Sequence, residues 1–196
     1  MSRKLLSPIL FTSLVLSVSA CGASGSVTAG DELSVSASKV APGPTNAASL
    51  TELRQVTARF QRFEDAQAAG YTTKVTPCWA HHSAGAMGFH YGKMDLFDAN
   101  ADLFAPEVVM YEPQAGGHLK LVGMEYIVPK EAWAAAGHSL TDPNDRPQLL
   151  GQTFTPHSSL PIFKLHIWLW RDNPQGTFAD WNPKVSCDNT TDAEVF

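Results

Sequence analysis

The chain has 196 residues, of which 14 are Lys or Arg and 19 are Asp or Glu, so its formal net charge is −5. No cluster of Lys and Arg follows the first few residues, which argues against a nucleic-acid partner and against an electrostatic grip on anionic lipid. Small-molecule ligands, metal ions and other proteins remain as the expected partners.

The first 20 residues have the order of an export signal: a positively charged start, an apolar run, and small residues before Cys21. The apolar run is interrupted and falls short of the roughly 20 residues that a membrane-spanning helix needs, so we expect residues 1–20 to be cleaved. The tetrad V-S-A-C that ends at Cys21 resembles the lipobox of bacterial lipoproteins. That resemblance implies that lipid on Cys21 is the membrane anchor of the mature chain. An ordinary secretory signal that ends at Ala20 is the alternative.

Residues 21–48 are rich in Gly, Ala, Ser, Thr and Pro and carry few large apolar side chains. Such a segment cannot bury enough apolar surface to fold, so it is predicted to be a flexible tether. Residues 49–196 are then expected to form a single globular domain. Its place would be outside the cytoplasm, on the outer face of the cell membrane or in the periplasm or at the outer membrane.

If Cys21 carries lipid, Cys78 and Cys187 remain as a pair. In an oxidising exported compartment such a pair is expected to form a disulfide. The alternative is a soft-metal site in which Cys78 acts with His81 and His82, but their spacing matches no strong zinc or haem pattern.

Residues 50–69 have apolar side chains at three- and four-residue intervals, which predicts one amphipathic helix, capped by Ser49 or Thr51 and ended by Gly70. Short apolar runs between turn-forming residues then predict strands. The predicted strands are residues 87–91, 108–112, 118–128 and 162–171; a hairpin loop is expected at 113–117, a short helix at 130–136, and a long surface loop at 138–161. The predicted fold is α+β, with the N-terminal helix packed on a mainly antiparallel β-sheet or small barrel.

The predicted strand 162–171 has two faces of different character. One face is wholly apolar and is expected to lie in the core: Phe163, Leu165, Ile167 and Leu169. The other face combines a cation, an imidazole and two indoles, and is expected to form a pocket wall that binds a ligand: Lys164, His166, Trp168 and Trp170.

His90, in the predicted strand 87–91, is a second candidate for a site residue. If this segment is extended, His90 shares its face with Gly88 and Gly92, and glycines in a strand often mark the close approach of a ligand or of another backbone. A histidine that is hydrogen-bonded inside the core is the alternative.

Glu112 and Glu125 each lie in an otherwise apolar strand. A buried carboxylate is costly unless it is paired or bound to a cation, so each needs a partner. The candidates are a metal held together with His90 and His166, or a cation such as Lys164. Two imidazoles with one or two carboxylates suit zinc, iron, copper or manganese, although the spacing is not diagnostic. His118, after the predicted hairpin loop, is expected to lie near Glu112.

Four stretches of sequence resemble a group of exported bacterial proteins that are described only as hypothetical: GAMGFHY (85–91), YEP (111–113), LVGMEY (121–126) and LHIWLW (165–170). The resemblance implies no activity. The motifs of serine hydrolases, phosphate-binding loops and dinucleotide-binding enzymes are missing.

Two hypotheses follow. In the first, the chain is a surface-anchored metal-binding protein, with a divalent transition metal at His90, Glu112, Glu125 and His166, whether or not it is an enzyme. In the second, it is a lipid-tethered binding or envelope-interaction protein, in which those residues form a structural network and the face with Trp168 and Trp170 binds an apolar or carbohydrate ligand.

Overall fold

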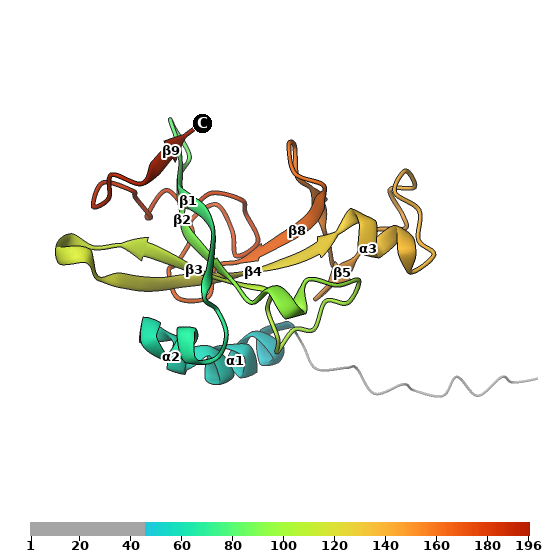
Figure 1. The fold of residues 1–196 in the computed structure, drawn as a ribbon, viewed down its shortest axis with the longest axis horizontal. Helices are drawn as coiled ribbons and strands as arrows, with labels where there is room; N and C mark the ends of the chain where they lie inside the picture. Colours follow the sequence, from blue (N-terminus) through green and yellow to red (C-terminus); the bar gives the residue numbers. More distant parts are fainter. Residues whose placement is uncertain (1–45) are drawn as a thin grey trace, which may run out of the picture. The chain divides into compact units, whose positions relative to one another are not determined.

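A seven-stranded sheet organises the chain in the computed structural model, which describes residues 46–196 (Figure 1). The predicted export signal, Cys21 and all of the predicted tether up to residue 45 lie outside the described residues. The strands are β1 Thr73–His81, β2 Gly85–Gly92, β3 Val108–Pro113, β4 Leu119–Pro129, β7 Thr155–Pro156, β8 Ile162–Ile167 and β9 Ala193–Val195, and they follow the order β7-β8-β4-β3-β2-β1-β9 across the sheet. Strands β5 Gln148–Leu149 and β6 Gln152–Thr153 pair separately.

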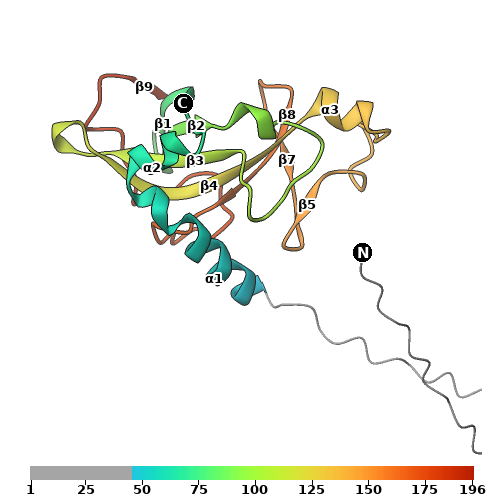
Figure 2. The same cartoon turned by 60° about the horizontal axis from the view of Figure 1, so that its bottom comes forward.

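The sheet is antiparallel at every pairing except that of β1 with β9, which is parallel. Strands β3 and β4 run side by side as a long hairpin, while β1 and β2 turn out of their plane, so the sheet is curled into a half-barrel (Figures 1 and 2). The prediction of an α+β fold with a mainly antiparallel sheet is confirmed at this level.

Strands β1, β5, β6, β7 and β9 were not expected from the sequence. Strand β1 contains Pro77, and its pairing with β2 is irregular at several points, so its apolar residues do not alternate cleanly. Strand β9 is only three residues long. The predicted strand 162–171 is shorter than expected, because ladder pairing in β8 stops at Ile167, and the predicted loop 138–161 contains the short strands β5, β6 and β7.

The helical segment differs from the single helix expected at 50–69. It consists of α1 Asn46–Thr57, a 3-10 turn at Ala58–Gln61 and α2 Phe63–Ala68, with an extended backbone at Arg62 between the last two. Helix α1 begins inside the segment predicted as a tether, so Ser49 and Thr51 are not caps. The Thr51 hydroxyl instead donates to the carbonyl of Ala47.

The other helices are α3 Lys130–Ala135 and two 3-10 turns, η2 Met94–Leu96 and η3 Ala115–Gly117. None of the helices between residues 46 and 196 combines the length and the apolar character needed to cross a bilayer.

The alternation of side chains along the strands separates two apolar clusters on the sheet. The apolar face predicted for strand 162–171 lies in the first cluster, which contains Phe163, Leu165, Ile167 and Leu169 together with Val109, Met124 and Tyr126. The second contains Val108, Met110, Ile127 and Trp168, and it includes both Cys78 and Cys187.

The predicted disulfide is present. Cys78 in β1 is bonded to Cys187, 109 residues later, with their Cα atoms 5.9 Å apart. The bond fixes the C-terminal segment against β1, and paired backbone hydrogen bonds between Ala86 and Asn182 hold the same segment against β2. The chain after Trp168 therefore folds back onto the sheet, and it brings Val185 and Cys187 into the second cluster.

Candidate metal centre

Three side chains from three strands meet on the face of the sheet that carries the second cluster. His90 in β2 is opposite Met110 in β3, and Met110 is opposite Gly123 in β4. Glu125, two residues after Gly123 and on the same face, is the direct partner of His166 in β8. The register of β2, β3, β4 and β8 thus brings His90, Glu125 and His166 together, and all three are almost fully buried.

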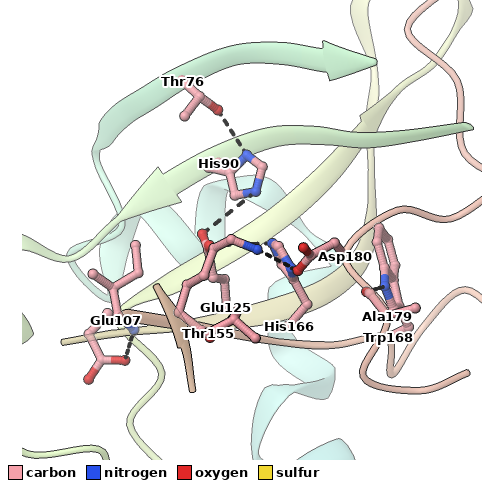
Figure 3. Close-up of polar contacts among 11 residues, drawn as sticks. Thr76, His90, Glu107, Glu125, Thr155, His166, Trp168, Ala179 and Asp180 are labelled. Carbon is pink, nitrogen blue, oxygen red and sulfur yellow. Dashed lines mark hydrogen bonds and ion pairs between the residues drawn. The ribbon is translucent and has the colours of Figure 1, made fainter. Parts of the chain in front are cut away.

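Both histidines point the same ring nitrogen toward Glu125 (Figure 3). His90 Nε2 lies 3.6 Å from Glu125 Oε2, and His166 Nε2 lies 3.3 Å from Glu125 Oε1. One donor atom of each residue lies within 4.8 Å of the other two. Two ligands at about 2.1 Å from one ion are themselves roughly 3 to 4 Å apart, so only a small contraction separates this arrangement from a coordination sphere.

The second ring nitrogen of each histidine, Nδ1, also has a polar partner. His90 Nδ1 is hydrogen-bonded to the hydroxyl of Thr76 in β1 at 2.8 Å, and His166 Nδ1 lies 3.4 Å from Asp180 Oδ1. In metal sites such partners fix the orientation of a ligating imidazole and its tautomer. The carboxylate of Asp180 also makes the imidazole of His166 a stronger electron-pair donor to a metal.

Nε2 of His90 and of His166 has no hydrogen-bond partner, and among the described residues no other buried side-chain nitrogen or oxygen shares this condition. Their contacts with Glu125 have the distance of a polar interaction but not the geometry of a hydrogen bond. A buried polar atom without a partner costs about 1–3 kcal/mol, so the pair calls for an explanation.

Burial disfavours the charged forms of His90 and Glu125 in the absence of a cation. Burial, with the positive field of His166 and Lys164, lowers the pKa of His90 well below its usual value, so its imidazole is neutral, as a metal ligand must be. Burial also raises the pKa of Glu125, although His166 and Lys164 oppose that shift. A divalent cation beside this carboxyl would favour its ionised form.

Lys164 was expected to line a ligand pocket or to pair with a buried glutamate. It lines a hollow together with Trp79 and Asp180, and its almost fully buried ammonium group makes an ion pair with Asp180 rather than with a glutamate. Hydrogen bonds from His166 and Lys164 hold the pKa of Asp180 well below its usual range. Asp180 is therefore an anion that links the lysine to the histidine.

Glu112 does not belong to the group, contrary to the prediction. Its Oε1 accepts a hydrogen bond from the backbone N–H of Ser186 at 3.1 Å. The register of β3 with β4 shifts between Met110 and Tyr111, and Glu112 pairs with Lys120 near the end of the hairpin. The irregularity and the distance along the strand separate it from Glu125.

The predicted ligand-binding residues do not share one hollow: Trp168 and Trp170 line one of about 340 Å³, and Lys164 lines another of about 200 Å³. Trp168 is buried beside His166, with ring centroids 6.2 Å apart, and its indole N–H donates to the carbonyl of Ala179. Trp170 faces Arg54, whose guanidinium lies 5.3 Å from the ring centroid. His118 is exposed on the β3–β4 hairpin and lines a separate hollow of about 580 Å³.

The sequence predicts a close approach of a ligand or a backbone at Gly88 and Gly92. At Gly88 the close neighbour is backbone: a Cβ atom would lie 2.4 Å from the carbonyl oxygen of Tyr111, and φ is +87°. A Cβ at Gly92 would meet the side chains of Val75, Met94 and Phe97. Both glycines serve packing around His90.

The donor set of His90, Glu125 and His166 could hold a metal ion. Two imidazoles and one carboxylate would leave coordination positions open, and they suit zinc, iron, copper or manganese. Chemically, an ion held there could bind and polarise an oxygen-containing ligand. Comparisons with protein-family models, with curated proteins and with solved structures found no match to this chain.

Proposed function

We propose that this protein is an exported, membrane-anchored metal-binding protein, in which His90, Glu125 and His166 hold one divalent transition metal. The observation that carries the proposal is the pair of buried Nε2 atoms, which lack hydrogen-bond partners and both face Glu125. Coordination of one ion by both atoms would remove the cost of leaving them unpaired.

The alternative, a structural hydrogen-bond network, fits this observation less well. Such a network stabilises a protein only when its members are satisfied. Here the Nδ1 atoms have partners, in Thr76 and Asp180, whereas the two Nε2 atoms that would join the histidines to Glu125 have none.

The proposal takes export and lipid attachment from the N-terminal sequence, with Cys21 as the acylated residue, and takes the group of exported bacterial proteins as the protein's relatives. The Cys78–Cys187 disulfide is consistent with an oxidising compartment. An anchored site of this kind would take its metal from outside the cytoplasm.

In the proposal, α1 and α2 cover the face of the sheet opposite the metal centre (Figure 2). Support comes from Leu53 and Phe60, which are buried in the same apolar cluster as Val109, and from the Tyr111 hydroxyl, which donates to the carbonyl of Phe60 at 2.6 Å. The metal face is then covered by the C-terminal segment and by the turn between β7 and β8.

The metal content of the purified protein tests the central part of the proposal. We expect one transition-metal ion per chain, and its loss in His90→Ala, His166→Ala and Glu125→Gln. His118→Ala and Glu112→Gln are the matched controls, because they change the same residue types outside the group, and they should retain the ion. A protein that neither carries metal nor takes it up when offered would leave the structural network as the better account.

The anchor is tested separately by mass spectrometry of the membrane fraction. We expect a mature N-terminus at Cys21 that carries lipid, and a Cys21→Ala variant that is no longer found with membranes. A mature chain that starts at residue 21 without lipid would instead indicate an ordinary secretory signal.

A further inference from the structure

A small pocket reaches the metal centre at Glu125. Its volume is about 160 Å³. The residues around it come from β1, β4, the segment after η2 and the turn between β7 and β8: Val75, Thr76, Trp79, Phe97, Glu125, Ile127, His157, Leu160, Pro161 and Ile162. Two of them belong to the centre itself, since Glu125 is a ligand in the proposal and Thr76 holds His90.

The walls of this pocket are almost wholly apolar, and Glu125 is the one charged side chain among them. An ion or a sugar would lose water there without regaining hydrogen bonds, so the chemistry excludes both. The volume of the pocket also limits the size of its ligand, because an apolar cavity of roughly 150 Å³ holds a molecule such as benzene. The pocket therefore fits a single ring.

His157 supplies a polar group at the edge of this pocket. Its Nδ1 accepts hydrogen bonds from the backbone N–H groups of Ser159 and Leu160, at 3.2 and 3.1 Å. In the neutral ring the proton must then lie on Nε2, which can donate to a ligand oxygen. The indole of Trp79 also lines the pocket, and its ring centroid lies 5.6 Å from that of His157 and 5.8 Å from that of His90.

From these features we infer that the pocket binds a small aromatic hydroxy compound of one ring, with its ring against the apolar walls and its oxygen on the metal beside Glu125. The inference rests on the proposed metal site for the oxygen contact, but the ring-binding pocket is formed by the protein alone. His157 is a positioning residue that donates to the same oxygen.

Titration with 4-fluorophenol, followed by ¹⁹F NMR, tests the pocket in metal-free protein and in protein loaded with Co²⁺. We expect saturable binding of one molecule per chain in both forms, and a change in the visible spectrum of the bound Co²⁺. Fluorobenzene, which has the ring but lacks the oxygen, should bind without changing that spectrum.

Two leucine variants locate the binding. Leu160 lines the pocket and is 42% exposed, whereas Leu140 is 47% exposed and does not line it. Leu160→Trp should weaken 4-fluorophenol binding by about tenfold or more by filling the pocket, and Leu140→Trp should leave it unchanged. Because both side chains are at the surface, both variants should fold.

The outcomes separate this inference from the proposed function. Metal uptake without 4-fluorophenol binding overturns the inference and leaves the metal site intact. Ring binding in a protein that takes up no metal overturns the proposed function and the oxygen contact together. Binding that Leu160→Trp does not weaken lies elsewhere, and also overturns the inference.

Discussion

Thr76 and His90 are cross-strand partners in β1 and β2, and the hydroxyl of Thr76 is hydrogen-bonded to His90 Nδ1 at 2.8 Å. This contact fixes the imidazole with its other nitrogen toward Glu125. The orientation of a proposed metal ligand thus depends on a residue of a neighbouring strand that has no contact with the ion.

Replacing Thr76 by valine should weaken metal binding about 10- to 100-fold, because Val has a similar shape but lacks the hydroxyl that holds His90. Competition with a chelator of known affinity measures the change. Thr57→Val is the matched control: it also removes a buried hydroxyl, which donates to the carbonyl of Leu53 outside the centre, and it should leave metal affinity unchanged. Equal affinities in the two variants would show that Thr76 does not position His90.

Removing the carboxylate of Asp180 should weaken metal binding at least as strongly. In Asp180→Ala, His166 loses its Nδ1 partner, and the buried ammonium of Lys164 is left unpaired beside the centre, where it repels a cation. We expect a loss of about 10- to 100-fold in affinity, with partial recovery when Lys164→Met is added.

Asp172→Ala is the control for this variant, since Asp172 makes a comparable ion pair with Lys184 at the surface. Metal affinity should be unchanged there. Failure of Lys164→Met to restore any affinity in the Asp180→Ala background would contradict the proposed role of the unpaired charge.

Glu107, which is not one of the proposed metal ligands, should make the stability of the protein depend on pH. Its carboxyl is buried and accepts a hydrogen bond from the backbone N–H of Ile127 at 3.0 Å, and burial raises its pKa to about 8. The folded protein therefore holds a proton that the unfolded chain has released above about pH 4.5. The free energy of unfolding should fall as the pH rises from about 4.5 to about 8, by up to about 5 kcal/mol from this group.

Urea unfolding of metal-free protein across this pH range measures the effect. In Glu107→Gln the side chain can still accept from Ile127 but does not ionise, so this part of the slope should vanish. Parallel pH profiles for the two proteins would show that Glu107 has an ordinary pKa.

The disulfide should contribute a large share of the stability. Cys78 and Cys187 are 109 residues apart, and closing a loop of that length stabilises a protein by roughly 5 kcal/mol in the chain-entropy account. The Cys78→Ala/Cys187→Ala variant should unfold at a lower urea concentration than the parent. An unchanged midpoint would mean that the contacts between β1 and the C-terminal segment suffice without the bond.

Alternation along the strands was enough to predict all three proposed ligands, although it also selected Glu112. His90, Glu125 and His166 each stand out as polar residues in strands that are otherwise apolar, and the sequence marks such residues as needing partners. Glu112 met the same criterion but lies elsewhere. Glu112 differs from the three proposed ligands because of the register between strands and its shift near Met110. Neither can be recognised from the local sequence.

The supporting residues were missed for a related reason. Thr76 lies in β1, which is hard to recognise in the sequence because it contains Pro77 and pairs irregularly. Asp180 lies in a stretch whose composition is typical of a turn. Both reach the site only through tertiary structure: Thr76 by pairing of β1 with β2, and Asp180 because the chain folds back after β8. The disulfide was predictable because only two cysteines remained once Cys21 was assigned to lipid.

The most direct test of the metal site is anomalous diffraction from crystals of the metal-loaded protein, measured at the absorption edge of the ion. We predict one strong peak about 2.0–2.2 Å from His90 Nε2, from His166 Nε2 and from a carboxylate oxygen of Glu125. A peak at any other group of residues, or no peak in protein that contains stoichiometric metal, would contradict the account.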